Sequence, residues 1–86
     1  MSDATTLLQD RGKNYGNYLT NATISQNLKD VMHEAPNWNR LSADKKESLE
    51  MIALKIARLL NGNPAHLDHW RDIIGYATLI ATTLKD

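Results

Sequence analysis

Residues 42–84 decide the fold, and they read SADKKESLEMIALKIARLL-NGNP-AHLDHWRDIIGYATLIATTL. Apolar residues recur every three or four positions on both sides of the NGNP interruption, which is the spacing of amphipathic helices. No segment shows the strict alternation that strands require. We therefore predict two helices, over residues 43–61 and 64–84, that pack as an antiparallel hairpin because their connection is very short.

Four residues at the ends of these segments support the predicted boundaries. Ser42 is a preferred N-cap residue, and Gly62 suits the left-handed position that often ends a helix. Asn63 can cap the next helix, and Pro64 is favoured at a first helical position because its missing N–H costs nothing there. A core stripe is expected on each helix, formed by Leu49, Ile52, Ala53, Ile56, Leu59 and Leu60 on the first and by Leu67, Trp70, Ile73, Ile74, Ala77, Ile80, Ala81 and Leu84 on the second.

Two more helices are predicted upstream. A short one begins after Ser2 or Asp3 and ends near Gly12, and a structured turn follows over residues 11–18. The next helix is capped by Thr20 or Asn21. It stops before Pro36, because the residue before a proline avoids helical geometry. The whole chain, residues 1–86, is expected to form one small all-α helical bundle.

Composition narrows the function classes. Ten basic residues balance ten acidic ones over 86 residues, and this balance argues against a general nucleic-acid binder. There is no cysteine, so disulfides, thiolate metal sites and thiol catalysis are excluded. The sequence shows no export signal and no apolar run of membrane-spanning length, so we expect no membrane association and a cytoplasmic location.

A second apolar stripe lies opposite the core stripe on both long helices. It contains Met51 and Leu54 on one helix and Gly75 and Leu79 on the other. A glycine inside a helix costs about 1 kcal/mol relative to alanine, so Gly75 requires a reason, such as the close approach of a helix or a ligand. We expect a homo-oligomer, most simply a dimer, with these four residues at the contact. The alternative is scatter, because single exposed apolar residues are common.

Glu47-x-x-Glu50 on one helix and Asp72 on the next resemble the all-α nucleoside-triphosphate pyrophosphatases of the MazG type. That family pairs Glu-x-x-Glu with Glu-x-x-Asp to hold magnesium against nucleotide phosphates. Here His69 stands where the second motif has its glutamate, and Asp68, one turn before Asp72, can substitute. The resemblance implies an Mg²⁺ site formed by Glu47, Glu50, Asp68 and Asp72.

Two segments are similar to small phage and prophage proteins related to that group, namely Arg11–Gly16 and Met51–Arg58. The similarity covers residues 11–80 and implies a nucleotide-binding protein of the host cytoplasm. If the metal site is real, Glu50 and Asp72 must face each other across the hairpin, because the ligands of one magnesium ion lie close together.

Four residues are candidates for contact with a nucleotide. Lys55 and Arg58 can neutralise phosphate, and Tyr15 can stack on a base. Tyr76 lies at the edge of the stripe that contains Asp72. The structural alternatives are solvent-facing side chains for the two cations, an ion pair of Asp72 with Lys55 or Arg58, and a bundle-closing plug for Tyr15.

The sequence therefore favours a nucleotide-binding protein with a degenerate magnesium site, and it leaves open whether the protein is a pyrophosphohydrolase. The alternative is a non-enzymatic helical module that binds a host protein or sequesters a nucleotide signal. Replacement of the family's glutamate by His69 favours the module, whereas retention of Glu50 and Asp72 favours the magnesium-dependent reading.

Overall fold

The computed structural model describes residues 16–84, and this part of the chain is all-helical. Within residues 16–84, three α-helices and one short 3-10 turn follow one another: α2 (Tyr18–Glu34), η1 (Trp38–Arg40), α3 (Ala43–Asn61) and α4 (Leu67–Ala81). The prediction of a small all-α bundle is confirmed. The predicted helix before Gly12 lies outside the described residues, as does Tyr15.

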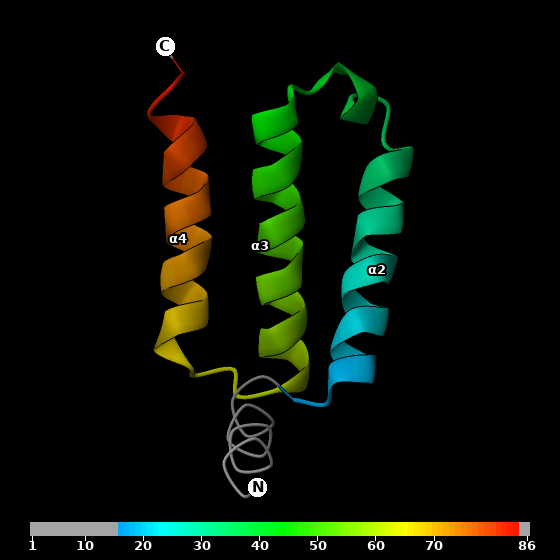
Figure 1. Cartoon of the computed structure of the whole chain (residues 1–86), viewed down its shortest axis with the longest axis vertical. Helices are drawn as coiled ribbons and strands as arrows, with labels where there is room; N and C mark the ends of the chain where they lie inside the picture. The colour runs from blue at the N-terminus through cyan, green and yellow to red at the C-terminus, as the bar shows by residue number, and fades with distance from the viewer. Residues whose placement is uncertain (1–15, 85–86) are drawn as a thin grey trace, which may run out of the picture.

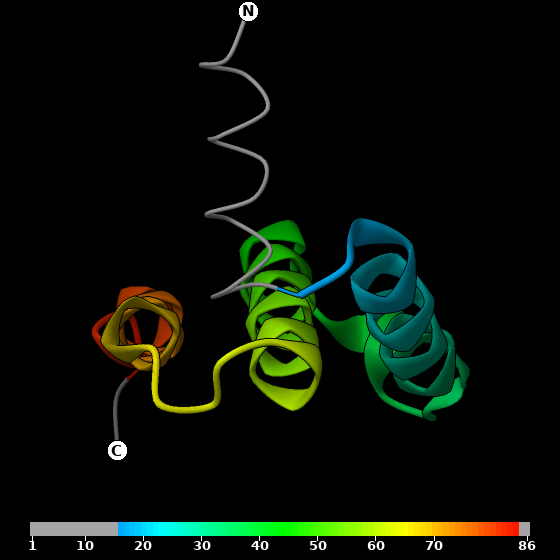
Figure 2. The same ribbon diagram turned by 90° about the horizontal axis from the view of Figure 1, so that it is seen from below.

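The three α-helices lie side by side with α3 in the middle (Figure 1). Seen from below, they form one row (Figure 2). α3 packs against α2 on one side and against α4 on the other, and the two outer helices make little or no direct contact. α3 and α4 form the predicted antiparallel hairpin (Figure 1). The described helices thus make a single layer with two broad sides.

α2 begins earlier than the sequence suggested. Its N-cap is Asn17, whose side chain accepts a hydrogen bond from the backbone N–H of Thr20 at 3.1 Å. The prediction that Thr20 or Asn21 caps this helix was wrong, because Asn17 is itself a favoured cap residue and reaches the first turn. The helix ends at Glu34, two residues before Pro36 as expected.

The turn between α3 and α4 also differs from the prediction. Gly62 has φ −109°, so it does not adopt the left-handed conformation expected of it. The Asn63 side chain accepts from the N–H of Ala65 at 3.0 Å and stabilises a turn where a helix start was predicted. α4 therefore begins at Leu67 and ends at Ala81, inside the predicted limits of 64 and 84.

Gly16 joins the start of α2 to the end of α3. It has φ +81°, a left-handed conformation that favours glycine. A Cβ on Gly16 would lie 2.5 Å from the side-chain nitrogen of Asn61 and 2.7 Å from its carbonyl oxygen. Asn61 Nδ2 donates to the carbonyl of Asn17 at 3.2 Å and to Oδ1 of Asn21 at 3.0 Å. This joint fixes α2 beside α3.

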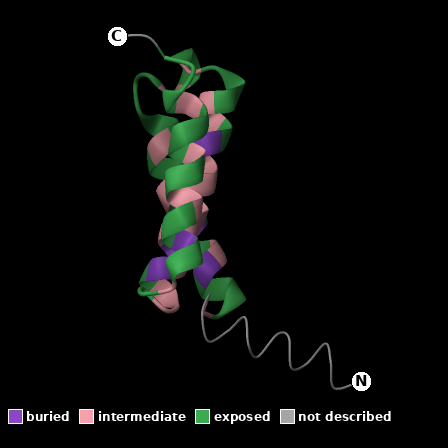
Figure 3. Ribbon diagram, turned by 90° about the vertical axis from the view of Figure 1, so that its left-hand side faces the viewer, coloured by how far each residue is buried: buried purple, intermediate pink, exposed green. Residues whose placement is uncertain are grey.

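Few apolar side chains are buried. Among the described residues the buried hydrophobic set is Ala53, Ala57 and Leu59, all on α3. Seen from the α4 side, most of the ribbon is exposed or intermediate (Figure 3). The predicted core stripe of α4 is only partly covered: its Trp70 is 50% exposed and its Ile74 is 64% exposed. One layer of helices covers only the sides that face its neighbours.

Within residues 16–84, no helix is both long and apolar enough to cross a membrane.

Candidate functional site

An ion pair links α3 to α4 near the middle of the hairpin. Lys55 Nζ lies 2.9 Å from Asp72 Oδ2, and the lysine side chain is only 11% exposed while the aspartate is 46% exposed. The structural alternative considered for Asp72, an ion pair with Lys55, is therefore present. Lys55 extends from the flank of α3 that faces α4, and Asp72 lies at the solvent-exposed edge of the contact between the two helices.

A shallow hollow of about 420 Å³ opens beside this ion pair. Its walls come from a single side of α4, and its lining residues are Arg71, Asp72, Gly75, Tyr76 and Leu79. A Cβ placed on Gly75 would meet nothing within 4 Å. No contact inside the described chain therefore requires glycine at this position.

The electrostatics of the hollow centre on Asp72. Its hydrogen bond with Lys55 is the main cause that lowers the pKa of Asp72 from the ordinary value of 3.8. Burial opposes this shift, and the charges of Lys55, His69 and Arg58 add to it. The Asp72 carboxylate is therefore ionised at neutral pH. Arg58 is close enough to act on Asp72, and Arg71 adds a second guanidinium at the wall. Cations thus surround the carboxylate.

Glu50 lies in a different environment, against α2. Its Oε2 is 3.0 Å from Nε2 of His33, and the His33 ring lies 4.7 Å, centroid to centroid, from the ring of Trp38. Lys46 Nζ stands 6.0 Å from the centre of the Trp38 ring. Glu50 therefore belongs to a cluster that ties α2 and η1 to the upper part of α3, whereas Asp72 belongs to the α3–α4 contact.

The four carboxylates proposed as magnesium ligands do not converge within one copy. Glu50 is engaged by α2 and Asp72 by Lys55, on opposite flanks of the central helix. Across residues 16–84 no three acidic or histidine side chains gather closely enough to hold a metal ion. Glu47 is exposed, and Asp68 lies within 4.0 Å of His66 Nε2. The donor set of one chain does not fit a single magnesium ion, which prefers several oxygen ligands in a near-octahedral arrangement.

His69 occupies the position where the resembling family has a glutamate. Its side chain is 1% exposed, and its ring packs edge-on against His66 with centroids 4.6 Å apart. A buried residue at this point contributes to the α3–α4 interface and is not exposed to a ligand in the hollow. Asp68, one turn before Asp72, remains exposed.

The structure thus brings together part of the predicted ligand set. Lys55, Asp72 and Tyr76 lie at or beside the hollow, and Arg58 acts on it electrostatically. Sequence reasoning missed Arg71, which lines the hollow. Its helical position, four residues before Gly75, was a usable signal. The pairing of His33 with Glu50 had no such signal, because it depends on how α2 is placed.

A family model described as "Domain of unknown function (DUF6378)" matches residues 1–84, so the chain belongs to that family. No curated protein and no solved structure matches the chain. The description of the family names no substrate or partner, and the function must therefore be inferred from the geometry.

Proposed function

We propose that the protein binds a small phosphorylated ligand of nucleotide type in the hollow on α4, beside the ion pair that joins α4 to α3. The observation that supports this most is Gly75. A helix-interior glycine costs about 1 kcal/mol relative to alanine, and nothing in the described chain approaches it. A ligand that lies against the helix backbone at this point would explain why the position carries a glycine.

The charges around the hollow suit phosphate. An ammonium has three N–H donors, so the ion pair with Asp72 leaves Lys55 able to bind a ligand oxygen as well. Arg71 offers a planar fork that can hold a phosphate through two parallel hydrogen bonds. Arg58 adds positive potential nearby. Together these groups offset the charge of Asp72 and favour an anion.

The apolar part of the hollow suits the rest of a nucleotide. Tyr76 and Leu79 line it beside Gly75, and aromatic rings are common stacking partners for bases. A volume of about 420 Å³ lies within the usual range of ligand sites, roughly 300–1,000 Å³. The resemblance to MazG-type proteins agrees with this ligand class.

The proposal is for binding and not for hydrolysis. The carboxylates of one chain do not form a magnesium site, because Glu50 is paired with His33 on α2. Any magnesium would arrive with the phosphates of the ligand and meet Asp72 and the nearby Asp68. This favours the non-enzymatic version of the function, in which the protein sequesters a nucleotide unchanged.

The test is calorimetric titration of the full chain with nucleoside triphosphates and cyclic nucleotides, with and without Mg²⁺. Lys55→Met should weaken binding about 10-fold or more, because a hydrogen bond to a charged group is lost. Lys29→Met on α2 is the matched control, since Lys29 is also partly exposed but lies on the helix that does not contact the hollow. Equal effects of the two variants, or no binding by the unmodified protein, would refute the proposal.

Gly75→Ala gives an independent check at the same site. Its methyl group meets nothing in the free chain, so folding should be unaffected or improved, while the methyl group obstructs a ligand on the helix surface. Weaker binding in a fully folded variant supports the site. Chromatography of the nucleotide after incubation separates the two forms of the hypothesis, because intact nucleotide indicates sequestration and cleaved nucleotide indicates a pyrophosphohydrolase.

A further inference from the structure

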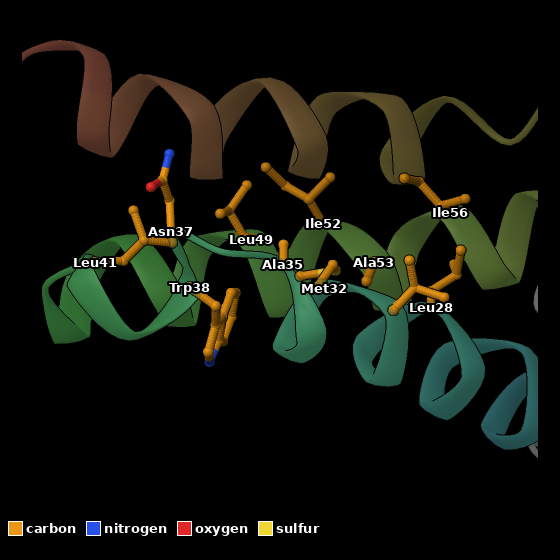
Figure 4. Close-up of a pocket in the computed structure, with 11 residues that line it drawn as sticks. Leu28, Met32, Ala35, Asn37, Trp38, Leu41, Leu49, Ile52, Ala53 and Ile56 are labelled. Atoms are coloured by element: carbon orange, nitrogen blue, oxygen red, sulfur yellow. The ribbon is translucent and has the colours of Figure 1, made fainter.

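An apolar surface lies on the side of the helix layer opposite Gly75 and Leu79, and Tyr76 stands at its border, where it lines both the ligand hollow and the apolar groove between α3 and α4. Two grooves form this surface, one of about 430 Å³ between α2, η1 and α3 and one of about 340 Å³ between α3 and α4. Both grooves are lined by Leu41, Leu49 and Ile52, so they are parts of one continuous surface, called the apolar face below. Figure 4 shows Leu49, Ile52 and Ile56 in a row along α3, with Leu28 and Met32 on α2 beside them.

Large side chains extend the apolar face beyond the grooves. Ile74 lies three residues before Ala77, which lines the second groove, and seven residues before Ala81, which also does, so it shares their side of α4. The same helical spacing adds Leu60 on α3 and Leu67 and Trp70 on α4. The residues of this surface that are 42–72% exposed are Val31, Leu49, Leu60, Leu67, Trp70, Ile74 and Leu84.

We propose that the apolar face is a dimerisation surface, on which a second copy of this chain stacks its own apolar face. The result is a two-layer helical bundle, and both ligand hollows remain on its outer sides. Domains are normally built from two packed layers around one core, and the described part of this chain supplies one layer.

The area available agrees with a dimer. A large apolar side chain offers roughly 100 Å² to be removed from water, so the seven exposed residues of the face offer roughly 700 Å² per copy. A standard stable interface buries about 800 Å² on each partner. The apolar face therefore approaches the size that a stable pair needs without help from other surfaces.

The scarcity of charged residues on the apolar face favours a second copy of the chain over a partner that is recognised by its charge. Among the described residues that line the two grooves, Lys45 is the sole charged one, and it lines only the α3–α4 groove. Stacking the face on itself therefore brings no like charges to its centre. A partner selected by charge would have nothing to recognise here. A second copy is also present whenever the chain is made, which suits a fold whose buried apolar set in residues 16–84 is Ala53, Ala57 and Leu59.

This interface is not the one that the sequence suggested. Met51, Leu54, Gly75 and Leu79 were expected at the dimer contact, but they lie away from the apolar face. Leu79 follows Ala77 by two residues, about 200° around the helix, and it lines the ligand hollow beside Gly75. The two candidate interfaces therefore make opposite predictions for substitutions on α4.

Ile74 and Leu79 provide a matched pair for the test. They are 64% and 63% exposed on the same helix, so neither substitution should damage the fold of a single chain. The full chain, Ile74→Glu and Leu79→Glu are compared by sedimentation velocity from low to high micromolar concentration, with circular dichroism to confirm helicity. The unmodified chain should sediment with twice the 9.7 kDa mass of one copy.

Ile74→Glu should raise the dissociation constant at least about 100-fold, whereas Leu79→Glu should change it little. Ala81→Glu, on the same face, repeats the test if Ile74→Glu loses helicity. A single-chain mass for the unmodified protein at high micromolar concentration would overturn the proposal. Loss of the dimer in Leu79→Glu but not in Ile74→Glu would also overturn it and would place the contact on the opposite side.

Discussion

The two sides of the helix layer differ in the residues that they expose and in the helices that build them. On one side, the apolar face runs across α2, α3 and α4, with Leu49 and Ile52 at its centre. On the other side, called the charged side below, Lys55 and Asp72 join α3 to α4 beside a hollow that contains Gly75. Within one helix, a rotation of about 200° separates the two sides. A helix in a single layer thus has two exposed stripes, and the residue types on each indicate what covers it.

This difference explains why hydrophobicity alone did not identify the core. Trp70 and Ile74 belong to the strongest apolar stripe of α4, yet they are half or more exposed. His69 is polar and almost fully buried. Burial in one chain follows the direction of the neighbouring helix, and the apolar stripe is turned partly away from that direction.

The largest effect is expected where the layer itself is held together. Gly16→Ala forces a residue with a Cβ into φ +81° and against the backbone of Asn61. The free energy of unfolding should fall by about 2–4 kcal/mol from backbone strain and overpacking. The apolar face should weaken as well, because α2 lines one of its grooves and would no longer be fixed beside α3. Urea unfolding followed by circular dichroism measures this, and a loss below about 0.5 kcal/mol, the size of an ordinary surface change, would contradict it.

Leu49→Ala tests the apolar face alone. Leu49 lines both grooves, so its truncation should cost about 2 kcal/mol or more when a second copy covers it. Leu79→Ala makes the same change in size on the charged side, and its cost should stay below about 1 kcal/mol. Because dimerisation couples stability to concentration, the midpoint of thermal unfolding should rise with protein concentration. The prediction would be contradicted by a thermal midpoint that does not depend on concentration, together with equal losses of stability in Leu49→Ala and Leu79→Ala.

Gly75→Ala tests the charged side without touching the apolar face. Alanine is the better helix former, and its methyl group meets nothing here, so the free energy of unfolding should increase by about 0.5–1 kcal/mol. The dimer dissociation constant should be unchanged. Destabilisation in a chemical unfolding experiment would instead mean that something presses on this glycine, and a weakened dimer would place the partner on the charged side.

The smallest effect concerns pH and the exposed carboxylates. Hydrogen bonding to Lys55 lowers the pKa of Asp72 below 3.8 in the folded chain, and hydrogen bonding to Ser42 lowers the pKa of Asp44 in the same way. A lowered pKa means that the folded state binds fewer protons than the unfolded state as the carboxylates titrate. This stabilisation is complete above the ordinary value of 3.8 and disappears as pH falls through the folded-state pKa.

Unfolding free energies measured from neutral pH down to about pH 2.5 should therefore decline below about pH 4 in the unmodified chain. Lys55→Met should flatten this decline by restoring the pKa of Asp72, and Asp44→Asn should flatten it independently at the start of α3. An unchanged pH profile in Lys55→Met would show that the ion pair on the charged side contributes nothing to folding.

Local signals in the sequence predicted much of the fold and part of the site. The spacing of apolar residues predicted that α3 and α4 exist, and their short connection predicted that they are antiparallel. Pro36 predicted where α2 ends. The ion pair of Lys55 with Asp72 was foreseeable as one alternative, since both residues lie on the predicted hairpin. The start of α4 could not be predicted in this way, because the Asn63 side chain stabilises a turn that competes with the first turn of the helix.

The sequence by itself determined the helices, because periodicity, caps and proline act within a few residues of one another. The tertiary structure decided which stripe of each helix faces its neighbour, since that depends on contacts between residues far apart in the chain. Asn61 meets Asn17 and Asn21, which come about 40 positions earlier. The placement of α2 in turn gives Glu50 its partner His33. Glu50 and Asp72, which the resemblance places in one metal site, are thereby separated in space. Only the arrangement of helices in one layer creates the apolar face.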